Sequence, residues 1–134
     1  MSGPDNTSLL SSALGGFLPG GVEYSVGVIP GEARFEFPLE AERLATAGEY
    51  RRSEFVAGRG CARAALGQLG FAPGPILPDE FGVPLWPDGT VGAISHSRGY
   101  CAAIAARSAD CRTLGLDLEK TNRLSPAAIK LTVH

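Results

Sequence analysis

Two carboxylates placed two residues apart are the first candidates for chemistry, because Asp117 and Glu119 alternate with Leu114, Leu116 and Leu118. This period-two pattern predicts a strand with one buried face, so both carboxylates leave the other face together. Like charges side by side repel each other and add no stability to a strand. A divalent cation reverses that balance, and Mg²⁺ prefers carboxylate and phosphate oxygens. Asp117 and Glu119 are therefore a candidate metal-binding pair, and a solvated strand face is the alternative.

A group of arginines supplies the second candidate chemistry. Arg51 and Arg59 are eight residues apart, so on a helix they lie within about 80° of each other, and Arg63 follows one turn later. The planar guanidinium presents donors suited to phosphate. The alternative is that these arginines pair with Glu49 and Glu54 on a solvated helix face. We predict that Arg51 and Arg59 act on phosphate and not on the fold.

Ser95 and His96 are adjacent and end an apolar run that predicts a strand. A serine hydrolase with Asp117 as its third member is disfavoured, because adjacent strand residues point to opposite faces and Ser95 cannot easily reach His96. No Gly-x-Ser-x-Gly elbow is present either. His96 is then either a structural histidine or a phosphate-facing one, with Ser95 supplying a hydroxyl or a backbone donor. A Ser-His strand end, arginines and a carboxylate pair together are the parts of a Mg²⁺–diphosphate site.

The elements that must position these residues follow from periodicity and from turn residues. The pattern predicts helices over 8–17 and 39–69 and strands over 22–29, 91–97, 100–106 and 113–119. Gly48, Gly58 and Gly60 weaken the second helix, so we expect either a break near Gly48 or a packing reason for these glycines. The two strands 91–97 and 100–106 are close enough in sequence to form an antiparallel hairpin, which indicates an α+β fold. Ser125 and Pro126 are a good start for a further helix up to His134.

The composition limits the class of protein. A chain of 134 residues is enough for one domain, and its net charge of −2 does not favour nucleic acid as a partner. Its three cysteines lack metal-ligand spacing, and without a signal peptide they are expected to be reduced thiols in a cytoplasmic protein. No apolar run is long enough to span a membrane. We expect residues 1–134 to form a single domain in which residues 1–7 are disordered.

Three segments occur in a fixed order: Arg-Arg-Ser-Glu-Phe-Val-Ala-Gly-Arg-Gly-Cys-Ala-Arg at 51–63, Gly-Val-Pro-Leu-Trp-Pro-Asp-Gly-Thr-Val-Gly-Ala-Ile-Ser-His-Ser at 82–97, and Gly-Leu-Asp-Leu-Glu at 115–119. In this order they resemble the surfactin-type and enterobactin-type 4′-phosphopantetheinyl transferases, over about residues 40–119. The resemblance implies one half of that family's pseudo-two-fold α+β fold, with a long helix packed on a small antiparallel sheet. It also implies Mg²⁺-dependent transfer of phosphopantetheine from coenzyme A to a serine of an acyl or peptidyl carrier protein.

The resemblance also assigns roles to individual residues. Arg51 and Arg59 match the arginines that hold the 3′-phosphate of coenzyme A, and Ser95 and His96 match the Ser-His pair at the diphosphate. Gly82 and Pro84 match the loop that covers the nucleotide by backbone contact. Asp117 and Glu119 match the metal-binding Asp-x-Glu, and we expect Asp117, Glu119 and His96 to be catalytic.

The sequence departs from the family pattern in two places. Pro78 and Phe81 occupy the region in which many members carry a lysine. The family's second half brings a Trp-x-x-Lys-Glu-Ala-x-x-Lys helix, and nothing here matches it. We therefore expect this chain to present half of a site, and to self-associate or pair with a complementary C-terminal half. Two alternatives are a non-catalytic domain that binds coenzyme A or a partner, and a structural α+β domain without a ligand.

Overall fold

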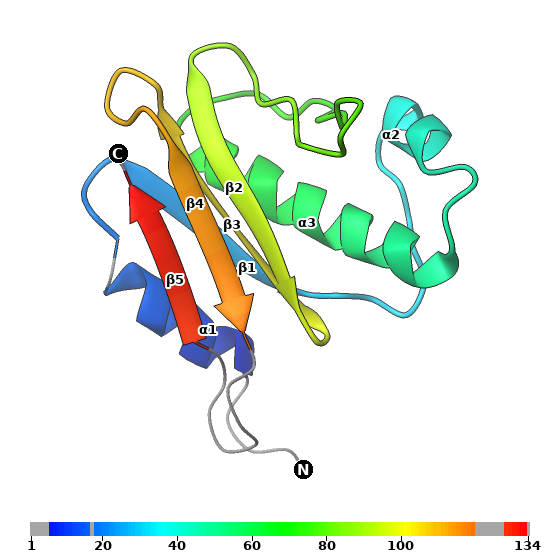
Figure 1. The fold of residues 1–134 in the computed structure, drawn as a ribbon, viewed down its shortest axis with the longest axis horizontal. Coiled ribbons are helices and arrows are strands. Elements are labelled where there is room, and N and C mark those ends of the chain that lie inside the picture. The colour runs from blue at the N-terminus through cyan, green and yellow to red at the C-terminus, as the bar shows by residue number, and fades with distance from the viewer. Residues whose placement is uncertain (1–5, 17, 120–127, 134) are drawn as a thin grey trace.

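The computed structural model describes residues 6–16, 18–119 and 128–133, which fold as an α+β protein (Figure 1). The elements in chain order are α1 (Asn6–Gly15), β1 (Val22–Val28), α2 (Pro38–Arg43), α3 (Glu49–Gln68), β2 (Thr90–Ser97), β3 (Tyr100–Arg107), β4 (Leu114–Glu119) and β5 (Ala128–Val133). No described helix is long and apolar enough to cross a membrane. Of the residues expected to be disordered, 1–5 lie outside the described residues, whereas Asn6 and Thr7 belong to α1.

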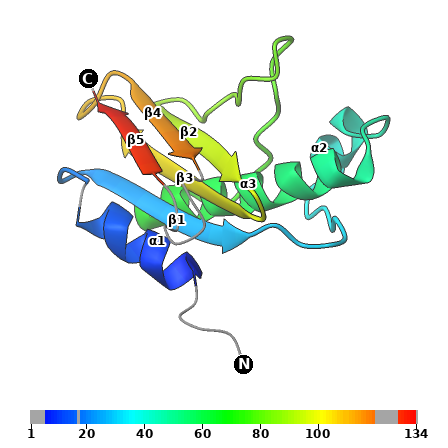
Figure 2. The same cartoon turned by 60° about the horizontal axis from the view of Figure 1, so that its bottom comes forward.

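The predicted hairpin forms the centre of a three-stranded antiparallel sheet with the order β1-β3-β2. β3 is rich in alanine, and its residues from Cys101 to Ala106 are fully buried. Its odd-numbered residues pack against α3, whereas its even-numbered residues pack with α1 and β4. The two helices therefore cover opposite faces of this sheet (Figure 2). A strand of alanines allows both layers to approach the sheet closely.

The long helical segment is divided as predicted. α2 ends at Arg43 and α3 begins at Glu49, with Gly48 in an extended conformation as its N-cap. At the other end, the Phe71 N–H donates to the Leu66 carbonyl over 3.1 Å, which closes the last turn. Trp86 is partly buried and packs against the core between α3 and the sheet.

The prediction of a helix after Ser125 is wrong for Ala128–Val133, which form β5 and pair antiparallel with β4. Ser125 and Pro126 lie outside the described residues. Apolar residues alternate in this segment at Ile129, Leu131 and Val133, and a strand partner distant in sequence outweighs a local helix start. β4 runs alongside β2 in both views (Figures 1 and 2).

Candidate functional site

Three of the predicted site residues, Arg51, Arg59 and His96, lie close together where α3 crosses the end of β2. His96 Nε2 lies 3.0 Å from the Glu54 carbonyl oxygen of α3. The helix comes this close because residue 58 is glycine: a Cβ there would lie 2.9 Å from His96 Nε2 and 2.8 Å from Ile94 Cγ2. The sequence predicted a packing reason for the helix glycines, and Gly58 supplies it. His96 is thereby held against the arginine-bearing helix.

Burial lowers the pKa of His96, since the imidazolium loses hydration there, although the neighbouring Glu54 opposes this shift. Arg51 and Arg59 lower the pKa of His96 further, so all three groups lie within electrostatic reach of one another. His96 is therefore neutral at pH 7. Because a carbonyl can only accept, Nε2 donates to Glu54 and Nδ1 remains an acceptor.

Arg59 is buried, with 4% of its surface exposed. Its Nε donates to the Ile76 carbonyl over 2.8 Å, and its guanidinium carbon lies 4.0 Å from the centre of the Phe55 ring. Burial lowers the pKa of Arg59 to about 10, which still leaves it charged at pH 7. Its Nη2 is buried without a hydrogen-bond partner among the described residues. A buried cation with a spare donor is an arrangement that an anion would complete.

Arg51 faces the same ring from the surface. Its guanidinium carbon lies 5.9 Å from the centre of the Phe55 ring, and its Nη1 lies 3.7 Å from a Glu54 carboxylate oxygen. The side chain is 48% exposed, so this pair adds little stability and leaves Arg51 available. Arg52 instead donates to the Leu44 carbonyl over 2.7 Å, which assigns it to the fold.

The structure divides the arginines more finely than the sequence did. Arg63 forms a buried ion pair with Glu40, with 2.6 Å between Nη1 and Oε2. Glu40 is almost completely buried, with 1% of its surface exposed. Arg59 also contributes to the fold through Ile76, so the prediction that it acts on phosphate and not on the fold was incomplete. Nothing local in the sequence reports that Glu40 faces an arginine 23 residues away.

Gly82 and Pro84 lie in a tight hairpin that follows the proline-rich loop. An isolated bridge joins Pro84 to Pro78, and the Asp79 carboxylate accepts from the Phe81 and Val83 N–H groups over 2.8 and 2.9 Å. Gly82 has a φ of +85°, which a side chain would strain. Phe81 is 82% exposed at the tip. Gly82 therefore has a turn-forming role, and its contact with a nucleotide stays a prediction.

Ser95 and His96 have different partners, as expected for adjacent strand residues. The Ser95 hydroxyl accepts from the Leu118 N–H over 3.0 Å, which joins β2 to β4 midway between the two candidate metal ligands. This arrangement lacks the hydrogen bond from nucleophile to base that a serine hydrolase needs. The Ser-His pair and the carboxylate strand are thus neighbours.

Asp117 is exposed on β4, and the Glu119 side chain lies outside the described residues. Within the described ranges, no three His, Cys, Asp or Glu side chains gather as a metal site. An exposed carboxylate oxygen next to the Ser-His strand is nevertheless a donor that fits Mg²⁺. The metal pair remains a prediction.

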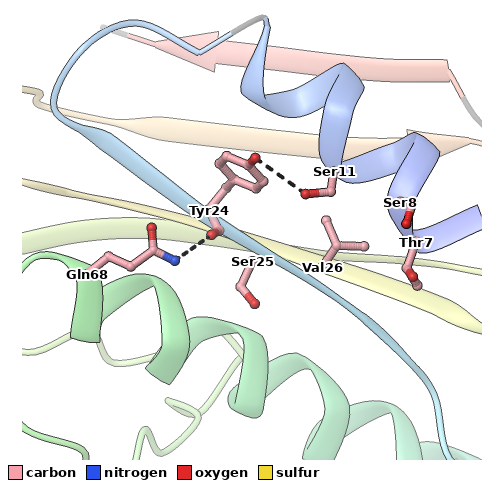
Figure 3. A pocket seen from close by; sticks show the side chains of 7 residues that line it. All are labelled: Thr7, Ser8, Ser11, Tyr24, Ser25, Val26 and Gln68. Carbon is pink, nitrogen blue, oxygen red and sulfur yellow. Dashed lines mark hydrogen bonds between the residues drawn. The ribbon is translucent and has the colours of Figure 1, made fainter.

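A separate cavity of about 460 Å³ lies beside the free edge of β1, away from these residues (Figure 3). Its lining is Thr7, Ser8, Ser11, Tyr24, Ser25, Val26 and Gln68. Gln68 donates to the Tyr24 carbonyl over 3.1 Å, and the Ser11 and Tyr24 hydroxyls are 3.4 Å apart. This lining contains no charged side chain, so the cavity does not suit a polyphosphate.

Comparison with known proteins gives one consistent result. The family profile described as the 4′-phosphopantetheinyl transferase N-terminal domain matches residues 39–106. The chain is 46% identical over 95 residues to the 4′-phosphopantetheinyl transferase Svp of Streptomyces mobaraensis, a match that covers 71% of this chain and 39% of that protein. It is also 46% identical over 82 residues to the transferase PptT of Mycobacterium tuberculosis, covering 61% of this chain and 36% of the relative.

A third relative is enterobactin synthase component D of Salmonella typhimurium, which is 40% identical over 79 residues, or 59% of this chain and 32% of that protein. The chain thus spans well under half the length of each of these relatives. The profile match includes the arginines of α3, the Gly82 hairpin and the Ser-His pair. It ends before Asp117 and Glu119.

Proposed function

This chain belongs to the 4′-phosphopantetheinyl transferase family, and we propose that it supplies the coenzyme A-binding half of such an enzyme. The reaction moves 4′-phosphopantetheine from coenzyme A to a serine of an acyl or peptidyl carrier protein. The observation that carries the proposal is that Arg51 and Arg59 both lie over the Phe55 ring, while His96, which contacts the neighbouring Glu54 carbonyl, lies within electrostatic reach of both arginines. Two guanidinium cations and an imidazole, all at the contact between α3 and the end of β2, form a site for the phosphates of coenzyme A.

Arg59 is the principal phosphate ligand in this proposal. Its buried Nη2 has a hydrogen to donate, and its position over Phe55 orients the guanidinium plane. A contact made away from water is stronger than one on the surface. Arg51, which is half exposed, adds a second charge at the mouth of the site. Together they select the 3′-phosphate of coenzyme A.

His96 and Ser95 serve the diphosphate. His96 Nε2 is occupied by the Glu54 carbonyl, so only a protonated Nδ1 can donate to an anion. A diphosphate favours that proton, and binding therefore includes proton uptake by His96. Ser95 accepts from Leu118 and keeps its own hydroxyl hydrogen free to donate.

Asp117 and Glu119 hold Mg²⁺ in this proposal, because oxygen donors on β4 adjoin Ser95. Bound there, the ion neutralises charge on the diphosphate. The Gly82 hairpin, which is tied to α2 through Arg43 and the Pro78 carbonyl, covers the nucleotide.

The test is a titration with coenzyme A and with 3′-dephospho-coenzyme A in the presence of Mg²⁺. Loss of one charge-assisted contact corresponds to about 1.5–3 kcal/mol. Arg59→Ala is therefore expected to weaken coenzyme A about tenfold or more and the dephospho form much less. Arg112→Ala is the control, because this exposed arginine directly precedes β4, whereas His96 is next to the last residue of β2. The start of β4 and the end of β2 lie at opposite ends of the two strands (Figure 1).

Equal losses for the two ligands in Arg59→Ala would place the 3′-phosphate elsewhere. A protein that binds neither ligand would refute the proposal itself. Mass spectrometry of a carrier protein then tests the transfer, since attachment of phosphopantetheine adds a defined mass.

A further inference from the structure

Glu40 is a buried carboxylate whose side-chain hydrogen bonds, among the described residues, go to Arg63 and Ile76, although its charge also raises the pKa of Arg59. It lies in the first turn of α2, and its Oε2 accepts from Arg63 Nη1 over 2.6 Å and from the Ile76 N–H over 2.8 Å. A buried carboxylate is costly unless it is paired and hydrogen-bonded, and both conditions hold here. Glu40 thereby connects α2, α3 and the proline-rich loop at a single oxygen.

Ile76 links this oxygen to the proposed phosphate site. Its N–H donates to Glu40, while its carbonyl accepts from Arg59 Nε over 2.8 Å. The two hydrogen bonds therefore fix the peptide groups on both sides of a residue whose side chain is itself 1% exposed. Arg63 adds a contact of 3.4 Å to the Gly74 carbonyl of the same loop. The loop is thus held against α3 by two arginines one turn apart and by Glu40.

The orientation of Arg59 depends on that carbonyl. The guanidinium is planar, so a bond at Nε and a ring beneath it together determine where Nη2 points. If the Phe55 ring were its only contact, the Arg59 guanidinium could rotate within its own plane. The Ile76 carbonyl removes that rotation, and the Ile76 N–H bond to Glu40 keeps the carbonyl in place.

We propose that Glu40 is a positioning residue for the 3′-phosphate of coenzyme A, acting through Ile76 to aim the free Nη2 of Arg59. This inference rests on the proposed function. Glu40 sets the preference for the phosphorylated form of the coenzyme without contacting it. A group held in place before binding loses less freedom when the ligand arrives, so its contact is worth more.

The test compares Glu40→Gln with the parent protein, again by titrating coenzyme A and 3′-dephospho-coenzyme A with Mg²⁺ present. Glutamine replaces the shared carboxylate oxygen by a neutral amide oxygen or by an amide N–H group. In either case the hydrogen bond from the Ile76 N–H is weakened or lost and the buried Arg63 loses its ion pair. We expect the affinity for coenzyme A to fall about tenfold and that for the dephospho form less than twofold. Glu40→Asp is the second variant: it keeps the charge beside Arg63 and withdraws the oxygen from Ile76.

Two controls separate positioning from general loss of stability. Leu14→Ala removes a fully buried side chain on the α1 face, far from Arg59, and is expected to lower the free energy of unfolding without changing the ratio of the two affinities. The Arg59 Nε–H resonance, followed by NMR without ligand, should shift in Glu40→Gln and stay unchanged in Leu14→Ala.

A double-mutant cycle completes the test. In an Arg59→Ala background, Glu40→Gln should no longer change the preference for coenzyme A over its dephospho form. An equal effect of Glu40→Gln in both backgrounds, or equal losses for both ligands, would overturn the inference. If Arg59→Ala loses the preference while Glu40→Gln and Glu40→Asp keep it, the proposed function stands and the role of Glu40 falls. If the parent protein shows no preference, the proposed function itself fails.

Discussion

Replacing Gly58 with alanine would place a methyl group between α3 and β2, at the point where His96 meets the helix. The new Cβ would lie 2.9 Å from His96 Nε2 and 2.8 Å from Ile94 Cγ2, so at least one side chain must move. Overpacking of this kind costs about 1–3 kcal/mol. Loss of the bond between His96 and the Glu54 carbonyl adds about 0.5–1.5 kcal/mol.

Gly60→Ala is a matched control, because it lies two residues later in α3 and no atom lies within 4 Å of its added Cβ. Both substitutions gain about 1 kcal/mol of helix propensity, so this gain cancels in the comparison. Gly58→Ala is therefore expected to be about 1.5–4.5 kcal/mol less stable than Gly60→Ala. Urea unfolding of the two variants measures this difference in the free energy of unfolding.

The same pair of variants tests the binding site. Displacing His96 removes a charge-assisted contact to the diphosphate, so Gly58→Ala should weaken coenzyme A about tenfold, whereas Gly60→Ala should bind as the parent protein does. Equal stabilities for the two variants would refute the close approach of helix and strand. A destabilised Gly58→Ala with unchanged affinity would show that His96 is structural and does not bind the diphosphate.

Two further predictions concern charge. Asp117→Ala should abolish the Mg²⁺ dependence of coenzyme A binding without unfolding the protein, since the Asp117 side chain is exposed. Calorimetric titration of coenzyme A with and without Mg²⁺ measures this dependence, and Asp88→Ala, at another exposed aspartate, is the control. Burial lowers the pKa of His96 below its ordinary value of 6.5, so the unfolded state binds the proton more readily. The free energy of unfolding should then be constant above about pH 7 and fall as the pH drops below about 6.5. His96→Gln should flatten this dependence. Equal slopes of the free energy of unfolding against pH in the two proteins would contradict the buried neutral imidazole.

The sequence predicted those parts of the fold that depend on local patterns. Alternation predicted β4, an apolar run predicted β2, and Gly48 predicted the division between α2 and α3. The helix expected after Ser125 was wrong because the partner that makes Ala128–Val133 a strand is β4, and a cap residue does not report a partner elsewhere in the chain. Pairing between distant segments overrides weak local preferences.

Within the candidate site, the sequence predicted that Arg51, Arg59 and His96 lie together, but not which hydrogen-bond and ion-pair partners their charged neighbours have. Arg59 and His96 were expected to face a ligand, and in the structure they lie within electrostatic reach of each other. It also uses Arg59 to hold Ile76, and it buries Glu40 against Arg63. A glutamate in the first turn of a helix normally lies in solvent, and only the tertiary packing shows that this one does not.

The arginines of α3 give the free protein a local excess of positive charge. Burial is the main cause of the lowered pKa of Arg59; the Glu40 carboxylate raises that pKa, and Arg51 and Arg63 each lower it further. Phe55 and Phe37 lie beneath the guanidinium groups of Arg59 and Arg63 and supply a further attraction. The mutual repulsion of the Arg51, Arg59 and Arg63 guanidinium groups lowers the stability of the free protein, and an anion bound among them would relieve that repulsion. The coenzyme's phosphates would therefore act as structural partners of α3 as well as substrate, because a ligand that binds only the folded state stabilises it.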